Sequence, residues 1–262
     1  MCLKRFACSC FLIFQLLFFP NKVSSLSDSL CIRGIYGRNA NRIITLANGL
    51  AEAQKHNLTL ALNKEWTLWY KTWFDMHEII RTNFVDKCHV ELKAKVLYRR
   101  NRLDAHNYEL SKLRPKKIYW LRAQHEINKR REISITVHRR WFEGECRSRA
   151  QAKEYFCKTS ADFLKVCYWT ESEIKNQLNM LMGTNITLSG GRILLFSDHQ
   201  MLKYDKTFKK EPKRKFQVEM CMMALSHAHF GSPMSSIDYI IAHWRHGSQF
   251  PIECFMQIHA HS

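Results

Sequence analysis

The segment 30–62 constrains the fold most, because its pattern changes from strand to loop to helix and back to strand. Residues 30–35 form an apolar run that predicts a short strand, and residues 37–42 predict a polar loop. Apolar and small side chains then recur at helical spacing across residues 43–51. Residues 58–62 predict a second brief strand. This order is the opening unit of an α/β fold.

The C-terminal half contains three predicted strands, and each ends in polar residues. The strand at 133–137 alternates apolar and polar side chains and ends in His-Arg-Arg. The strand at 193–196 ends in Ser-Asp, and the strand at 228–230 ends in a Ser-rich turn. Helices are predicted at 170–183, 218–225 and 237–244. In parallel α/β sheets, ligands bind beyond the carboxyl ends of the strands, so these polar residues predict a ligand site.

Two further segments have distinctive compositions. The aromatic residues of segment 64–84 predict a packed core face, with an acceptor or sugar platform as the alternative: Trp66, Trp69, Tyr70, Trp73, Phe74 and Phe84. Residues 85–131 are dense in Lys and Arg with weak periodicity, which predicts helices and loops that bridge two halves. The methionine cluster at 220–223 is interpreted as core filler.

The N-terminus has the layout of a signal peptide. Lys4 and Arg5 precede an apolar run at residues 6–19, and Pro20 follows it. The run is shorter than the roughly 20 residues that a membrane-spanning helix needs, which favours cleavage over a retained signal anchor. We therefore expect residues 1–25 to be a leader, and the protein to reside in the endoplasmic reticulum or Golgi lumen or to be secreted.

Sequons and cysteines agree with that route. Asn57 and Asn185 each begin an Asn-x-Thr sequon and are predicted glycosylation sites. An odd number of cysteines lies beyond the leader: Cys31, Cys88, Cys146, Cys157, Cys167, Cys221 and Cys254. In an oxidising compartment some of them should pair, although the sequence leaves the connectivity open.

The charge balance and the missing motifs narrow the class of ligand. The 262-residue chain has 41 Lys and Arg against 23 Asp and Glu, a formal net charge of +18, which favours anionic partners. It contains no phosphate-loop Gly-Lys-Ser/Thr and no Gly-x-Gly-x-x-Gly motif, which argues against ATPase and dinucleotide oxidoreductase functions. Nucleic acid is not an expected partner, because that function does not suit a leader. The isolated histidine pairs His227/His229 and His259/His261 do not predict a metal site.

The polar strand ends suit a nucleotide diphosphate. Guanidinium groups of Arg139 and Arg140 can hold phosphate oxygens through bidentate bonds. Serine hydroxyls before a helix, Ser235 and Ser236, favour phosphate as well. Asp198 can accept a hydrogen bond from a base or a ribose. A solvated basic turn remains the alternative for the arginine pair.

Three segments resemble the fucosyltransferase superfamily that includes the peptide O-fucosyltransferases and the α1,2- and α1,6-fucosyltransferases. Segment 37–42, Gly-Arg-Asn-Ala-Asn-Arg, is similar to the family's early Gly-Arg-x-Gly-Asn-Gln/Arg loop. Segment 137–143 is similar to its His-x-Arg-x-x-Asp/Glu motif. Segments 194–198 and 231–236 look like its late strand ending in Thr/Ser-Asp and its Ser-rich turn.

The resemblance implies a GT-B-like α/β fold with two facing Rossmann-like lobes and a central cleft. The acceptor lobe would be 26–125 and the nucleotide-sugar lobe 126–262. It further implies inverting transfer of fucose from GDP-fucose, the donor substrate, to a protein or glycan hydroxyl, with no cofactor and no metal required.

By residue, the resemblance implies that Arg140 stabilises the departing GDP and that His138 orients the donor. The other implied donor contacts are Gly37, Arg38, Asn41, Arg139, Asp198, Ser235 and Ser236. The general base stays open among Glu143, Glu145 and Asp75, with Glu143 the candidate in the motif. Ala40 and Trp141 depart from the family pattern. The alternative function is an inactive secreted relative that binds sulfated glycans or a receptor, for which the basic run 206–215 is suited.

Overall fold

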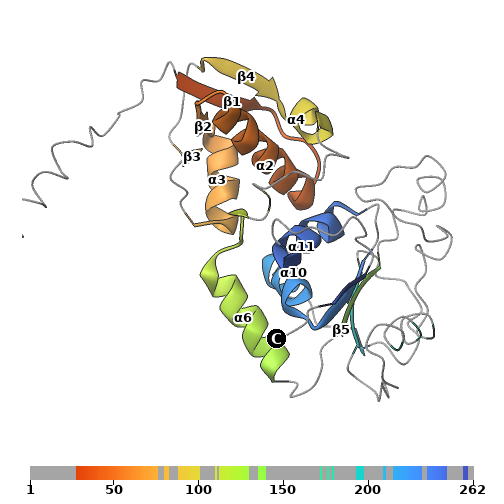
Figure 1. Cartoon of the computed structure of the whole chain (residues 1–262). Coiled ribbons are helices and arrows are strands. Elements are labelled where there is room, and N and C mark those ends of the chain that lie inside the picture. The colour runs from red at the N-terminus through yellow and green to blue at the C-terminus, as the bar shows by residue number, and fades with distance from the viewer. Residues whose placement is uncertain are drawn as a thin grey trace, which may run out of the picture.

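The computed structural model contains two sheets with helices packed between and around them (Figure 1). It describes residues 28–75, 80–82, 88–100, 110, 112–129, 135–139, 193–197, 209–210, 215–231, 235–246 and 256–258, and the single positions 172, 176 and 179. The predicted α/β class with parallel sheets is confirmed. In the described part of the chain, no helix has the length and apolar character that crossing a membrane requires.

The first sheet has the strand order β3-β2-β1-β4, and every neighbouring pair is parallel. Its strands are β1 (Ser29–Arg33), β2 (Thr59–Ala61), β3 (Ile80–Arg81) and β4 (Val90–Lys93). The predicted strands at 30–35 and 58–62 correspond to β1 and β2. The prediction of only helices and loops across 85–131 is wrong at β4. Glu91 and Lys93 alternate with half-buried Val90 and Leu92 on this edge strand, so its pattern is that of a charged surface.

Helix α2 (Asn39–Lys55) connects β1 to β2 and begins earlier than the sequence predicts. Residues 39–42 were expected to belong to a loop, and they form its first turn. Gly37 has φ +69°, a left-handed conformation that turns the chain without a Cβ penalty, and Arg38 is extended at the N-cap. The helix then buries one face against the sheet, with Ile43, Leu46 and Leu50 fully covered.

Asn57 ends α2 in a Schellman turn. It has φ +53°, and its N–H donates to the Gln54 carbonyl at 3.0 Å. Leu58 N–H donates to the Ala53 carbonyl at 2.8 Å. Asparagine tolerates the left-handed conformation better than most residues. Asn57 is therefore an exposed turn residue on the way into β2.

The aromatic segment forms the buried face of α3 (Lys64–Trp73). Asn63 caps this helix by accepting a 2.9 Å hydrogen bond from Trp66 N–H. The buried aromatic side chains of the segment are Trp66, Trp69, Tyr70, Trp73 and Phe74. The predicted core role is confirmed for these five residues, whereas Phe84 lies outside the described residues.

The second sheet has the strand order β7-β6-β5-β8-β9. Its strands are β5 (Ile135–Arg139), β6 (Ile193–Ser197), β7 (Lys209–Lys210), β8 (Ala228–Phe230) and β9 (Met256–Ile258). The pairs from β7 to β8 are parallel, and β9 is antiparallel to β8. All three strands predicted in this half are confirmed. The helix predicted at 170–183 lies largely outside the described residues.

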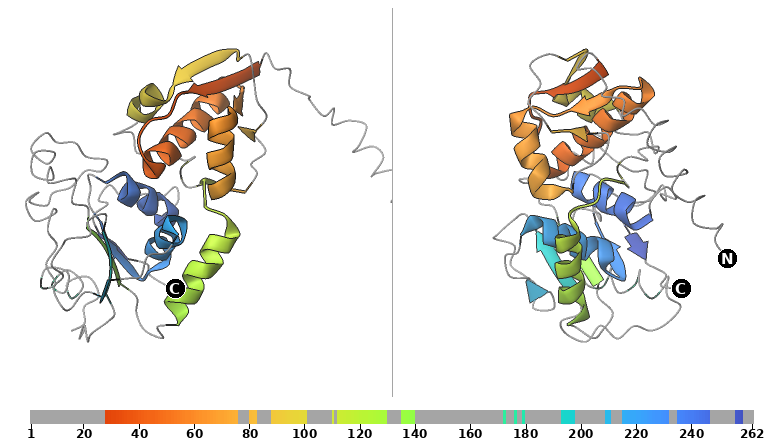
Figure 2. Two further views of the ribbon diagram at one scale, coloured as in Figure 1. Left: turned by 180° about the vertical axis from the view of Figure 1, so that it is seen from behind. Right: turned by 90° about the vertical axis from the view of Figure 1, so that its left-hand side faces the viewer.

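Helices α10 (Phe216–Leu225) and α11 (Ser236–His246) flank β8 in the chain and were both predicted. Figure 1 and Figure 2 show α2, α11 and α10 between the two sheets. Helix α11 packs on both α2 and α10. The methionines of α10, Met220, Met222 and Met223, are buried, which confirms their core role. Cys221 is buried and unpaired, and burial raises the pKa of its thiol.

The segment between the sheets contacts both halves. Lys116 N–H donates to the carbonyl of Trp73 at the end of α3, and Trp244 of α11 donates to the Leu113 carbonyl at 3.0 Å. Helix α6 (Lys117–Asn128) then packs along α10. Helix α4 (Ala94–Arg100) packs on α2. The sheets are therefore joined by continuous packing.

Cys31 of β1 and Cys88, just before β4, form a disulfide across 57 residues of chain. Replacing both by alanine should cost about 4 kcal/mol of unfolding free energy, since the bond restricts the unfolded chain. Urea unfolding of the oxidised protein and the double variant measures this difference. Reduction of the native protein should reproduce the loss, and equal urea midpoints in all three samples would contradict the prediction.

Candidate functional site

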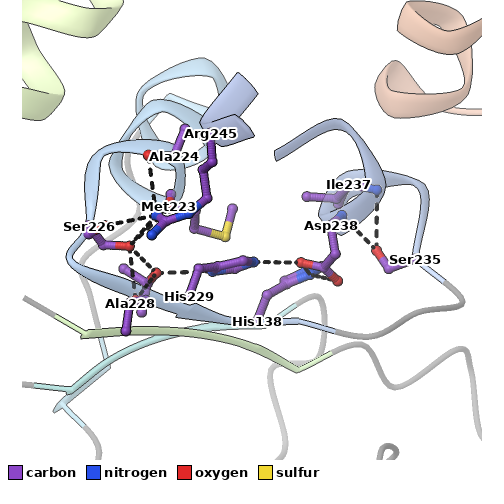
Figure 3. Close-up of polar contacts among 11 residues, drawn as sticks. His138, Met223, Ala224, Ser226, Ala228, His229, Ser235, Ile237, Asp238 and Arg245 are labelled. Carbon is purple, nitrogen blue, oxygen red and sulfur yellow. Dashed lines mark hydrogen bonds and ion pairs between the residues drawn. The ribbon is translucent and has the colours of Figure 1, made fainter. Parts of the chain in front are cut away.

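A buried carboxylate, Asp238, joins two histidines at the carboxyl end of β5 (Figure 3). His138 Nδ1 lies 2.8 Å from Asp238 Oδ2, and His229 Nε2 lies 2.9 Å from Asp238 Oδ1. All three side chains are at most 4% exposed. Because an ionised carboxylate only accepts, each imidazole must donate an N–H to it. This fixes which nitrogen of each ring carries hydrogen.

Helix α11 and the end of strand β8 position the carboxylate of Asp238. Ser235 caps the helix, because its Oγ accepts from Ile237 N–H at 3.2 Å. Asp238 therefore lies in the first turn, where the helix dipole favours a negative charge. Gly231 is packed so closely that an added Cβ would lie 2.7 Å from the Asp238 Cβ. Glycine at this position is what lets Asp238 approach the strand.

The electrostatic balance favours an ionised aspartate beside a neutral His229. Burial alone would raise the pKa of Asp238, but the charge and hydrogen bond of His138 and the hydrogen bond of His229 hold this pKa below its usual range. Burial lowers the pKa of His229 despite the hydrogen bond to Asp238. A neutral His229 that donates from Nε2 must accept at Nδ1, and Thr136 Oγ1 lies 3.0 Å away to donate.

Thr136 extends the network to Ser226 and Arg245. Its hydroxyl oxygen lies 2.7 Å from Ser226 Oγ. Arg245 Nη1 donates to the carbonyls of Met223 at 2.9 Å and Ser226 at 2.8 Å, at the C-terminal end of α10. Burial lowers the pKa of Arg245 to about 10, so it stays cationic near neutral pH. The network ties α10, β5, β8 and α11 into one polar support for His138.

A second group of predicted residues lies at the start of α2. Gly37 and Arg38 are exposed, and Asn41 packs against Gly37. The Arg38 side chain makes no capping bond, and the first turn holds no acidic residue. The N–H groups of this turn therefore suit an anion.

Two tryptophans of α3 hold the connection between β1 and α2. Trp66 Nε1 donates to the Gly34 carbonyl at 2.8 Å, and Trp69 Nε1 donates to Asn39 Oδ1 at 3.0 Å. The Arg42 guanidinium lies over the Trp69 ring, 6.0 Å from its centre. The aromatic segment thus supports the connection between β1 and α2 as well as the core.

Arg42 was not predicted as a site residue. It follows Asn41 on the first turn of α2, and its buried Nε makes no hydrogen bond to the residues that the structure describes. The sequence shows Arg42 as the second arginine of the Gly-Arg-x-Ala-Asn-Arg segment. No feature of the sequence distinguishes this arginine from an ordinary surface residue of a helix.

Of the other predicted site residues, the structure describes only some. Ser235 is buried in its capping role and Ser236 is half-buried as the first residue of α11. Asp75 is exposed, and Asn57 ends α2. The side chain of Arg139 and the whole of Arg140, Glu143, Glu145, Asn185 and Asp198 lie outside the described residues. No metal-binding group is found among the residues that the structure describes.

The network residues other than His138 were missed, although each is a polar residue in a short apolar stretch. His229 was considered only as half of a His-x-His pair. A polar residue within a strand that is buried on both faces needs a buried partner, and that partner, Asp238, is nine residues away on a helix. Strand patterns alone do not identify such a pairing.

Comparison with solved structures finds similarity to the fucosyltransferase POFUT1. The crystal structure of POFUT1 in complex with GDP matches with TM-score 0.51 and 13% identity, over 87% of this chain and 97% of that one. The complex with GDP-fucose matches with TM-score 0.52 and 11% identity, over 88% and 98%. No family model and no curated protein sequence matches the chain. The chain therefore has a fucosyltransferase-like fold.

Trp69→Phe tests the support of the loop, because it removes the indole N–H and keeps a ring. We expect faster amide exchange at residues 37–42 and a loss of about 1 kcal/mol in unfolding free energy. Hydrogen exchange followed by mass spectrometry measures the first effect.

The matched control is Trp73→Phe on the same helix. Trp73 is also buried and packs on Phe216 at 5.7 Å between ring centres. Its ring lies 6.1 Å from that of Trp69, but it donates neither of the hydrogen bonds to Gly34 and Asn39. Equal exchange of residues 37–42 in the two variants would show that the Trp69 bond does not hold the loop.

Proposed function

We propose that this protein is a glycosyltransferase that transfers fucose from GDP-fucose to a hydroxyl group of a protein or glycan, with inversion. The observation that carries the proposal is the fold shared with POFUT1 complexes of GDP and GDP-fucose over most of both chains. His138, from the predicted donor motif, lies at the end of a central strand of the second sheet. Ligands of parallel α/β sheets bind at such strand ends.

The proposed architecture is GT-B-like, with an acceptor lobe at 26–125 and a nucleotide-sugar lobe at 126–262 around a cleft. The two sheets, which are parallel except at β9, support this division. Residue 126 itself lies within α6, which packs along α10 of the second half.

In the proposed reaction, the acceptor oxygen bonds to the anomeric carbon of fucose as the bond from that carbon to the phosphate oxygen breaks. GDP leaves with both electrons of that bond. Arg140 and His138 stabilise the negative charge that develops on the diphosphate, and Arg139 adds a second cation. Asp198 contacts ribose or base, and Ser235 and Ser236 contact phosphate. The acceptor proton passes to a general base, for which Glu143 is our candidate.

The turn at the start of α2 would meet the donor from the other lobe. Gly37, Arg38 and Asn41 supply backbone N–H groups and polar side chains there, and Arg42 adds a guanidinium. This part of the proposal uses the uncapped helix N-terminus described above. No cofactor and no metal take part in the proposed reaction.

Calorimetric titration of the leader-free protein with GDP-fucose, GDP-mannose and UDP-sugars tests the donor. We expect selective binding of GDP-fucose, and a loss of roughly 10²–10³ in transfer rate for Arg140→Ala, as for lost oxyanion donors. Arg122→Ala on the exposed face of α6 is the control for removing one positive charge. A folded protein that binds no sugar nucleotide would refute the proposed activity.

The second candidate is a non-catalytic glycan-binding protein. The net charge of +18 favours it, because sulfated glycans are polyanions. This function predicts salt-sensitive heparin binding that survives Arg140→Ala.

We also propose that the protein enters the secretory pathway and is glycosylated at Asn57. The disulfide and the exposure of Asn57 support this route. Thr59→Val should remove one glycan, because it destroys the sequon and keeps a β-branched residue in β2. The mobility shift after glycosidase treatment of protein from secreting cells measures the change. Thr59→Ser retains the sequon and should keep the glycan. If Thr59→Val carries as many glycans as the native protein, the assignment of Asn57 is wrong.

A further inference from the structure

Three large aliphatic side chains are exposed on α3 and α6. Leu68 of α3 is 61% exposed, and Ile118 and Leu121 of α6 are 47% and 51% exposed. Among the residues that the structure describes, one further large apolar side chain is exposed, Val96 of α4. Single exposed aliphatic residues are ordinary on a protein surface, whereas a group of them on one surface marks a place where a partner binds.

Helices α3 and α6 together form one stretch of surface. The hydroxyl of Tyr119 in α6 donates a 2.8 Å hydrogen bond to the carbonyl of Thr72 in α3. Leu68 lies four residues before Thr72, which is about one helical turn, and Ile118 directly precedes Tyr119. Figure 1 and Figure 2 show the two helices following one another along one edge of the molecule.

The buried sides of both helices face α10. Trp73 of α3 packs on Phe216 at the start of α10, with 5.7 Å between the ring centres, and α6 packs along α10. At 3.6 residues per turn, Leu68 lies on the side of α3 opposite Trp73. By the same spacing, Leu121 lies on the side of α6 opposite the buried Ala123. The exposed aliphatic side chains of both helices therefore point away from the body of the protein.

Lysines surround these aliphatic side chains. Lys64 and Lys71 are exposed within one helical turn on either side of Leu68, and Lys117 is exposed beside the two aliphatic residues of α6. We call these six residues, Lys64, Leu68, Lys71, Lys117, Ile118 and Leu121, the α3–α6 face. Glu126 pairs with Lys129 at 3.6 Å. Over segments 64–75 and 116–129, six Lys and Arg stand against three Asp and Glu: Lys64, Lys71, Lys116, Lys117, Arg122 and Lys129 against Glu65, Asp75 and Glu126.

The composition of the α3–α6 face distinguishes among anionic partners. Protein interfaces are enriched in aromatic residues and depleted in lysine, whereas the tryptophans of α3 point into the core and lysines remain outside. A sulfated glycan held by cations alone would leave the exposed aliphatic side chains without a role. A lipid surface uses both groups, because aliphatic side chains enter the headgroup region and cations bind lipid phosphates. The long stems of lysine allow both contacts at once.

We propose that the α3–α6 face binds the surface of an anionic lipid membrane, with Leu68, Ile118 and Leu121 in the headgroup region and the three lysines at lipid phosphates. This contact is peripheral and reversible. It goes beyond the proposed sugar transfer and does not depend on it. In Figure 1, α10 and α11 lie between α6 and β5, so membrane contact at this face leaves the strand end at His138 uncovered.

The two kinds of side chain should contribute separately to binding. The triple variant Leu68→Gln/Ile118→Gln/Leu121→Gln removes the aliphatic groups without changing charge, and we expect it to weaken vesicle binding at least about tenfold. Lys64→Gln/Lys71→Gln keeps the aliphatic groups, and we expect a loss of about fivefold for each lysine. Added salt should weaken binding of the native protein, because it screens the attraction between exposed charges.

Co-sedimentation of the leader-free protein with vesicles of mixed phosphatidylcholine and phosphatidylserine measures these effects, with pure phosphatidylcholine vesicles for comparison. The matched controls are Val96→Gln and Lys95→Gln on α4, which change an exposed aliphatic and an exposed lysine outside the α3–α6 face. Both controls should bind the mixed vesicles as the native protein does.

Three results would overturn the proposal. The first is native protein that stays in the supernatant with both kinds of vesicle. The second is equal vesicle binding by the native protein and the triple glutamine variant, which would reduce the attraction to net charge. The third is binding to immobilised heparin without binding to vesicles, which would assign the positive charge to sulfated glycans. None of these measurements involves a nucleotide, so each result leaves the test of GDP-fucose binding unaffected.

Discussion

The C-terminal half depends on one buried negative charge. Asp238 is inaccessible to solvent, and three described parts of the chain accommodate it: β5 supplies His138, β8 supplies His229, and Gly231 leaves the space that a Cβ would fill. A buried carboxylate is tolerable only when its oxygens are fully hydrogen-bonded. The same bonds that satisfy Asp238 set the position of α11 on the sheet and the orientation of His138. The hydrogen bonds of Asp238 therefore contribute both to the stability of the fold and to the geometry of the candidate site.

The start of α2 shows the corresponding arrangement in the N-terminal half. The connection between β1 and α2 is held by the indole N–H groups of Trp66 and Trp69, at Gly34 and Asn39. Tryptophan is suited to this role, because its ring fills the core while its single donor reaches a polar group at the edge. The two alternatives for the aromatic segment, core or ligand platform, were thus too narrow. The rings lie in the core, and the indole nitrogens of Trp66 and Trp69 position the connection between β1 and α2. The start of α2 is suited to an anion.

The sequence predicted the elements with strong local patterns. The run at 193–196 is apolar throughout, the run at 228–230 is apolar apart from His229, and α10 and α11 follow from helical spacing. The edge strand β4 was missed because its charged residues resemble a surface helix. The start of α2 was predicted too late because its N-cap position holds Arg38, which is not a typical capping residue. Within the candidate site, His138 and the Ser-rich turn were predictable from motifs. Asp238, Thr136 and Arg245 were not, because their roles come from contacts between residues far apart in sequence, such as the bond between His138 and Asp238.

Sharing a fold with another protein and having a functional site are separate properties. The network around Asp238 bears on the second. The similarity to POFUT1 at 11–13% identity concerns the path of the chain. Packing alone would have been satisfied by apolar residues at positions 138, 229 and 238, since replacing buried ion pairs by well-packed hydrophobic groups is often neutral or stabilising. The chain instead has two imidazoles, a carboxylate and a close-packed glycine at the end of a central strand. Such an arrangement has a stability cost that a fixed orientation of His138 would justify, and this is why we propose that the function of the protein lies at that strand end.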